Sequence, residues 1–109
     1  MALIADTPTA PYYAVIFTSV QTDIDEGYDD TAQKMLDLAA DQPGFLGAES
    51  AREALGITVS YWRDLDAIKN WKAVGEHREA QKLGREKWYA SFKIRISKVE
   101  RDYGFHAGA

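Results

Sequence analysis

Cysteine is absent from this chain of 109 residues, and its absence excludes several kinds of site. Disulfide bonds, thiolate nucleophiles and cysteine-ligated metals are all ruled out. The sequence also lacks an apolar run near the roughly 20 residues that a membrane-spanning helix requires, so we predict no membrane partner. The N-terminal stretch MALIADTPTAPYY carries an acid instead of basic residues and makes a poor secretory signal. We therefore expect a cytoplasmic protein.

A surplus of positive charge is also missing. Lysine and arginine total 13 against 17 acidic residues, which gives a formal net charge of −4. Nucleic-acid-binding proteins usually present a basic face, so we predict no nucleic-acid partner. The chain has no glycine-rich nucleotide loop, no Gly-x-Ser-x-Gly elbow and no aspartate-rich calcium loop. Nucleotide-dependent chemistry, serine hydrolysis and a metal site are therefore not predicted.

The apolar residues that are present recur at intervals that predict six elements, between a mobile arm at residues 1–11 and a short tail at residues 106–109. The predicted strands cover residues 12–20, 45–52, 57–62 and 90–102. The first is dense in β-branched and aromatic residues, whereas the second is rich in small residues. The two predicted helices cover residues 28–39 and residues 64 to about 87, and the glycine at 75 interrupts the second, which resumes at about 76.

Local signals add detail to this outline. Asp23 or Asp25 is placed to cap the first helix, and Asp64 is placed to cap the second. In the last strand, apolar residues alternate regularly until Val99 falls out of step. That break predicts a bulge near Lys98.

The order β-α-β-β-α-β predicts an α+β, ferredoxin-like fold with four antiparallel strands and two helices on one face. The first strand is nevertheless apolar on both sides. Its two apolar sets are Tyr13, Val15 and Phe17 on one side and Ala14, Ile16 and Val20 on the other. Because two helices cover only one face, we predict a homodimer whose sheet faces pack together, an arrangement that can close a barrel-like core.

All three tryptophans and one of the two histidines fall within 27 positions, from 62 to 88. His77 has the chemistry of a proton acceptor or a haem-iron ligand, although a surface histidine of a helix fits its position as well. Trp71 lies on the apolar face of the second helix, where it serves either the core or a ligand. His106 belongs to the tail and is expected to be solvated.

Further candidates flank the second helix. Tyr61 and Trp62 end the third strand, and their alternation predicts that Trp62 faces the dimer side of the sheet or the mouth of a pocket. Trp88 and Tyr89 are adjacent and cannot share one face, so one is expected in the core and the other exposed to solvent or facing a ligand. Arg85 supplies a cation that can hold a carboxylate or a phenolate.

With these residues in view, the chain resembles the antibiotic biosynthesis monooxygenase (ABM) superfamily of dimeric α+β barrels. The resemblance covers about residues 12–105. It is carried by TVSYWRDLDAIKNW, HREAQKLGREKWY, FKIRISKVERDYGF and the Pro-Gly-Phe step at 43–45. It implies a homodimer with one pocket per subunit between sheet and helices. Some members oxidise phenolic polyketides or quinols with molecular oxygen and no cofactor, whereas others bind haem and open its ring.

The haem-degrading branch of the family uses an Asn on the first strand, a Trp on the second helix and a His ten residues later. Here Trp71 matches the Trp, but position 81 is glutamine and His77 follows after only six residues. The first strand offers Thr18 and Ser19 and no asparagine. Two of the three residues typical of haem degradation are therefore missing.

The resemblance and the residues together lead us to expect a monooxygenase that needs no cofactor and oxidises a small aromatic, phenolic or quinol-like molecule. We expect Trp71 and His77 to be catalytic. The expected substrate-binding residues are Tyr61, Trp62, Arg85, Trp88 and Tyr89. Two alternatives stay open: a haem-binding or haem-degrading protein with His77 as ligand, and a non-catalytic dimeric module that binds a small molecule.

Overall fold

The structure is a computed structural model that describes residues 3–76 and 87–108. Its elements are β1 (Tyr12–Gln21), α1 (Tyr28–Ala40), β2 (Phe45–Arg52), β3 (Gly56–Trp62), α2 (Leu65–Glu76) and β4 (Tyr89–Val99). The predicted order and the α+β ferredoxin-like class are confirmed. The helical run predicted after residue 76, together with His77 and Arg85, lies outside the described residues.

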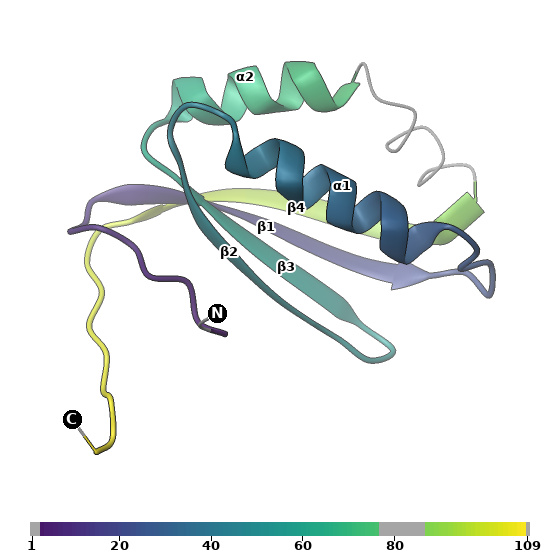
Figure 1. The fold of residues 1–109 in the computed structure, drawn as a ribbon, viewed down its shortest axis with the longest axis horizontal. Helices are drawn as coiled ribbons and strands as arrows, with labels where there is room; N and C mark the ends of the chain where they lie inside the picture. The colour runs from purple at the N-terminus through teal and green to yellow at the C-terminus, as the bar shows by residue number, and fades with distance from the viewer. Residues whose placement is uncertain (1–2, 77–86, 109) are drawn as a thin grey trace.

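The four strands form one antiparallel sheet in the order β2-β3-β1-β4. Figure 1 shows both helices on one side of this sheet and both ends of the described chain on the other side. We call the side that carries Trp62 the helix face, and the side that carries Tyr61 the open face. Since residues directly opposite in an antiparallel pair share a face, the register assigns every strand residue to one of the two.

The densest part of the core lies at the end of the helix face where β3 meets α2. Trp62 is fully buried there, at 0% exposure, against Ala39 of α1 and Ala67 and Ile68 of α2. The expectation that Trp62 faces the dimer side or a pocket mouth is wrong. The helices lie on the Trp62 side of β3, and the open face receives the alternate residues of that strand.

The beginning of α2 follows the predicted chemistry. The Asp64 carboxylate accepts a hydrogen bond from the Ala67 backbone N–H at 2.8 Å, so the predicted cap is confirmed. Gly44, just before β2, packs tightly against this helix. It has a left-handed φ of 86°, and a Cβ added there would lie 2.7 Å from the Ala67 Cβ. The turn therefore requires glycine for both conformation and space.

The beginning of α1 differs from the prediction. Neither Asp23 nor Asp25 caps this helix through its side chain. Gly27 occupies the N-cap position with a left-handed φ of 78°, and the Asp25 backbone carbonyl accepts the Tyr28 N–H at 2.9 Å. A backbone turn thus replaces the side-chain cap because glycine can adopt a conformation that aspartate adopts only at a cost.

The bulge predicted near Lys98 is wrong. Strand β4 pairs regularly with β1 from Val99, opposite Tyr12, to Ser91, and the register shifts only beyond Val20. Val99 is out of step with the apolar residues before it because it lies on the open face, opposite Tyr12. The strand also ends at Val99, three residues earlier than predicted.

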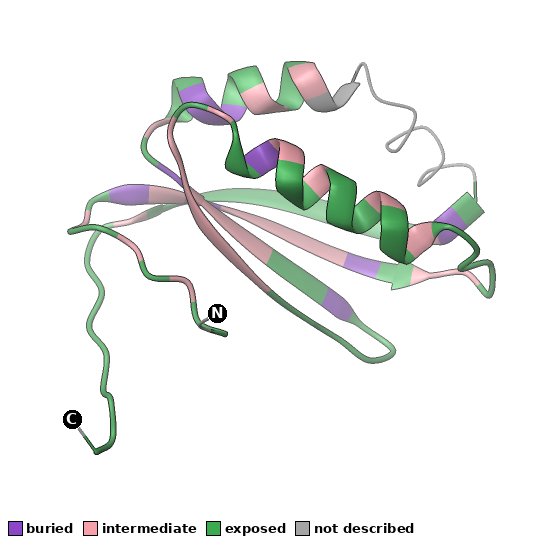
Figure 2. Ribbon diagram, viewed as in Figure 1, coloured by how far each residue is buried: buried purple, intermediate pink, exposed green. Residues whose placement is uncertain are grey.

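Coverage of the helix face is uneven. Phe92, Ile94 and Ile96 of β4 lie opposite helix-face residues of β1, yet their exposures are 42%, 49% and 54%. Figure 2 shows β4 exposed along most of its length beside the partly buried β1. We call these three residues the apolar row. Among the described residues, no helix is long and apolar enough to cross a membrane.

Candidate functional site

The predicted site residues that the structure describes separate into three places, while His77 and Arg85 lie outside the described residues. Trp62 and Trp71 stack at the packed end of the helix face, with ring centroids 5.9 Å apart and an interplanar angle of 24°. Trp88 and Tyr89 lie at the opposite end, where β4 begins. Tyr61 lies on the open face. The structure therefore does not bring Tyr61 together with the tryptophans.

Trp88 and Tyr89 have different surroundings, as their adjacency predicts. Trp88 is buried, and its indole N–H donates to the Glu26 carbonyl at 3.2 Å. Tyr89 is half-buried and packs edge-on against Phe17, with centroids 5.3 Å apart. Trp88 thus ties the start of β4 to the loop before α1, while the phenol of Tyr89 faces an aromatic group.

That aromatic group spans three elements. Tyr89 contacts Tyr28 of α1 at a centroid distance of 5.9 Å, and their hydroxyls lie 3.1 Å apart. Phe92 lies 5.9 Å from Tyr89 and 5.5 Å from Phe17. We call Phe17, Tyr28, Tyr89 and Phe92 the phenol cluster. It adjoins the apolar row through Phe92, so uncovered apolar surface lies beside two hydroxyls.

The protonation of Tyr89 limits what this cluster can do. Burial raises the pKa of the Tyr89 phenol well above its ordinary value, and the hydrogen bond with Tyr28 raises it further. The positive charge of Arg52 opposes that rise in pKa. At neutral pH the Tyr89 hydroxyl is therefore neutral and can donate or accept a hydrogen bond, but it does not act as a resident base.

Arg52 reaches this end of the helix face from the last position of β2. Its guanidinium donates a hydrogen bond to the hydroxyl of Ser19, a buried residue of β1. Sequence reasoning missed both Arg52 and Tyr28. A signal was available for Arg52, since Gly56 pairs with it across the hairpin and leaves room for a long side chain to lie over the sheet.

The open face carries a separate polar group in which two phenols donate to two carboxylates. Tyr61 donates to Glu49, and Tyr12 donates to Asp102. Burial, followed by the Glu49 hydrogen bond, raises the pKa of Tyr61. The Asp102 hydrogen bond is the main cause that raises the pKa of Tyr12. The Ala5 backbone N–H also donates to Glu49 at 2.9 Å, so this group anchors the N-terminal arm.

Two hollows in the described part of the chain lie away from the stacked Trp62 and Trp71. One, of about 330 Å³, is lined by residues 7–10 of the arm and residues 100–102 after β4. The other, of about 260 Å³, lies at the far end of β1 and β4 beside Leu55, with Lys93 and Arg95 in its lining. Within residues 3–76 and 87–108, no three His, Asp or Glu side chains gather as a metal-ligand set.

Comparison with known proteins decides the family. A model of the antibiotic biosynthesis monooxygenase family matches residues 11–83, about two thirds of the chain. The chain belongs to the antibiotic biosynthesis monooxygenase family. The predicted resemblance to the ABM superfamily is thereby confirmed.

Relatives agree with this assignment. The uncharacterized protein YqjZ of Bacillus subtilis is 54% identical over 103 residues, which are 93% of this chain and 90% of that protein. SnoaB, a cofactor-independent oxygenase from Streptomyces nogalater, superposes with a TM-score of 0.72 at 14% identity, over 85% of this chain and 97% of SnoaB. A conserved protein from Methanosarcina mazei gives a TM-score of 0.68 at 9% identity, over 84% and 94% of the chains. At these identities the two structures show that the ABM fold is shared.

Proposed function

We propose that this ABM protein is a cofactor-independent monooxygenase that oxidises a small aromatic, phenolic or quinol-like molecule with molecular oxygen. The observation that carries the proposal is the phenol cluster beside the apolar row. An aromatic ring can lie on the exposed Phe92 and Ile94, with its oxygen within reach of the Tyr28 and Tyr89 hydroxyls. SnoaB, which shares the fold, is a cofactor-independent oxygenase.

The proposed reaction balances without a cofactor. A phenol and one O₂ give a quinone and one water, because one oxygen atom enters the ring and the other leaves as water. Deprotonation makes the substrate electron-rich enough to reduce oxygen. The hydroxyls of Tyr28 and Tyr89 would position the substrate oxygen. His77 stays our proposed proton acceptor and Trp71 our proposed catalytic tryptophan.

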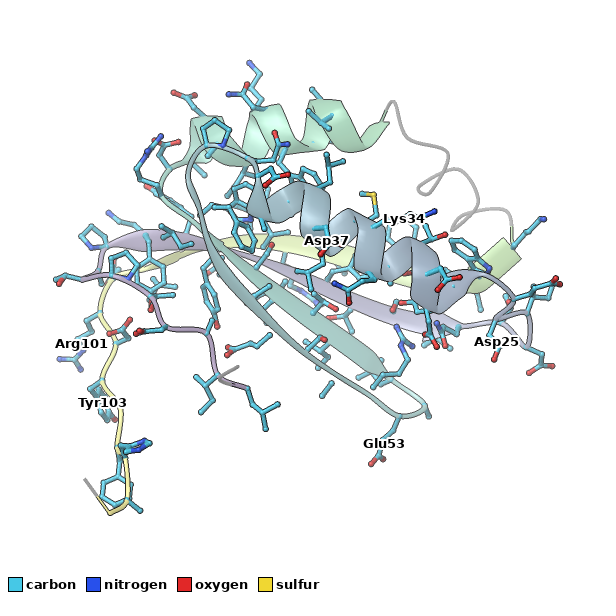
Figure 3. The ribbon with its side chains drawn as sticks, viewed as in Figure 1. Asp25, Lys34, Asp37, Glu53, Arg101 and Tyr103 are labelled. Atoms are coloured by element: carbon cyan, nitrogen blue, oxygen red, sulfur yellow. The ribbon has the colours of Figure 1, made fainter. Side chains whose placement is uncertain are left out.

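Oxygen uptake with a panel of phenols and quinols tests this proposal. Before the assay the protein is dialysed against a chelator, so that activity cannot depend on loosely bound metal. We expect uptake that falls several-fold in Tyr89→Phe, because one neutral hydrogen bond to the substrate is lost. Tyr103→Phe is the matched control, since that tyrosine lies on the exposed tail (Figure 3). No uptake across the panel would contradict the proposal.

We also propose that the enzyme is a homodimer joined through the open faces of two sheets. Ile57 and Val20 expose about 40% of their surface on this face, next to the half-buried Ile16 and Val59. Opposite charges lie toward its two edges, with Glu49 on β2 and Arg95 on β4. A twofold-related copy can cover the apolar centre and pair these charges.

Light scattering at micromolar concentration measures the molar mass of the protein in solution and so distinguishes a dimer from a monomer. We expect a dimer for the wild type and a monomer for Ile57→Lys, which places a charge in the centre of the proposed interface. Leu36→Lys is the control, because Leu36 is an exposed residue of α1. A wild-type monomer would overturn the dimer.

A further inference from the structure

Arg52 is a cation on the helix face that forms no ion pair with the residues at 3–76 and 87–108. Among the described residues, no carboxylate lies within ion-pair distance of its guanidinium, and its hydrogen bond goes to the neutral Ser19 hydroxyl. Glu53, the next residue, points away from the hairpin tip (Figure 3). Arg52 is itself exposed at the end of β2, so an anion from solvent can reach its guanidinium.

The sheet register places Arg52 in line with the phenol cluster. Arg52 pairs with Gly56, Gly56 with Ser19, and Ser19 with Phe92, so these four residues form one row across all four strands on the helix face. Phe17 lies in the neighbouring row of β1, two residues from Ser19. The row therefore joins a cation at one edge of the sheet to exposed aromatic surface at the other.

Gly56 allows the arginine to lie flat over the sheet. A Cβ added at Gly56 would lie 2.1 Å from the Arg52 guanidinium, so any larger residue forces that group away. Ser19 then holds the inner edge of the guanidinium. A guanidinium has five N–H donors in a planar fork, and within the described part of the chain one of them is used, for Ser19, so donors remain for a planar anion.

We infer that Arg52 is a specificity-determining residue that selects acidic aromatic ligands. The oxyanion of the ligand, a phenolate, enolate or carboxylate, pairs with the Arg52 guanidinium while its ring lies on Phe17 and Phe92. The inference rests on the proposed use of the helix face as the substrate site, and it adds the charge of the substrate. A cation at this place also favours the ionised form of a phenol, which is the form that gives electrons to oxygen.

Binding of two aromatic probes of equal shape and different charge tests the inference. The probes are 2-naphthoate, an anion, and 2-naphthamide, which is neutral, each titrated into the full-length protein by calorimetry at neutral pH and low salt. We expect the wild type to bind naphthoate about tenfold more tightly than naphthamide, the effect of one charge-assisted hydrogen-bonded pair. In Arg52→Gln this preference disappears while naphthamide affinity is unchanged.

Two further variants test whether the position of the positive charge, and not the net charge of the protein, causes the preference for naphthoate. Gly56→Ala keeps the arginine but displaces it, so the same loss of preference is expected. Arg63→Gln removes a positive charge paired with Asp64 elsewhere on the surface, and it should keep the preference. Equal affinity of the wild type for both probes, or an equal loss in Arg52→Gln and Arg63→Gln, would overturn the inference.

The binding assay is independent of turnover, so the two proposals fail separately. If naphthoate binding depends on Arg52 but no phenol supports oxygen uptake, the anion site is supported and the proposed oxygenase activity is contradicted. If the protein takes up oxygen but does not prefer naphthoate, the oxygenase activity is supported and the proposed role of Arg52 is contradicted.

Discussion

The two ends of the helix face use the same kind of residue for different purposes. At the packed end, Trp62 is fully enclosed by the two helices and stacks on Trp71. At the other end, which we call the exposed end, Phe92 and Ile94 remain 42% and 49% exposed beside two tyrosine hydroxyls and an arginine. One sheet thus has an aromatic core at one end and an aromatic surface at the other.

The difference between the two ends indicates which residues stabilise the fold and which are available to bind a ligand. Buried aromatic surface contributes to folding, whereas exposed aromatic surface with nearby polar groups remains available to a ligand. Helices α1 and α2 pack against Trp62 through Ala39, Ala67 and Ile68, which belong to these helices. Substitutions at the packed end should therefore affect mainly stability, and those at the exposed end mainly binding.

Truncation of one large aromatic at each end gives the largest expected contrast. Trp62→Ala should lower the free energy of unfolding by about 3–5 kcal/mol, because it leaves a cavity in the enclosed core. Phe92→Ala should cost only about 1–2 kcal/mol, since much of that ring is already in water. Urea unfolding at one fixed protein concentration measures both values, and similar losses would contradict the division into two ends.

Gly44 offers a second test of the packed end through space and backbone conformation. Gly44→Ala should cost about 1–3 kcal/mol, because alanine is strained at φ 86° and its Cβ would clash with Ala67. Gly104→Ala is the control, since a Cβ there meets nothing within 4 Å. If the two alanine variants unfold at the same urea concentration, the close approach at Gly44 is not important for stability.

The exposed end should respond to alkaline pH. Below pH 10, the ordinary pKa of tyrosine, both folded and unfolded Tyr89 are protonated, and the stability contribution is fully present. Above it the unfolded phenol ionises first, since the folded pKa is raised, so stability falls as pH rises through the raised pKa. Tyr89→Phe should make this fall shallower in urea unfolding series across that range. An unchanged slope would show that Tyr89 is not the responsible group.

The sequence predicted the architecture because strand and helix periodicity depends on each residue's near neighbours. The order of elements and the Asp64 cap both follow from local chemistry, and both are confirmed. The position of Trp62 was wrong because alternation assigns residues to two faces without saying which face the helices cover. The supposed bulge near Lys98 failed for the same reason, as Val99 is an apolar residue of the open face.

The phenol cluster shows the limit of local patterns more clearly. Tyr28 and Tyr89 are 61 positions apart, and their contact depends on how α1 crosses the sheet. Arg52 was predicted only as a strand end, because its position over Gly56 and Ser19 needs the pairing of three strands. The contacts between these site residues depend on strand register and helix packing, which cannot be inferred from local patterns in a single sequence.

The smallest expected effect concerns the Asp64 cap, which lies at the packed end but is exposed to solvent. Asp64→Ala should lower the urea midpoint modestly, because the Ala67 N–H loses its acceptor, while Asp64→Asn should keep most of the cap.

The cap should also make stability depend on acid pH. The Ala67 hydrogen bond lowers the pKa of Asp64 below its ordinary value of 3.8. The contribution of Asp64 to stability is therefore present above that value and is lost as pH falls through the lowered pKa. Asparagine should remove this acid dependence without removing the cap. An equal loss in Asp64→Asn and Asp64→Ala would mean that the negative charge of Asp64, more than its hydrogen bond, supports the beginning of α2.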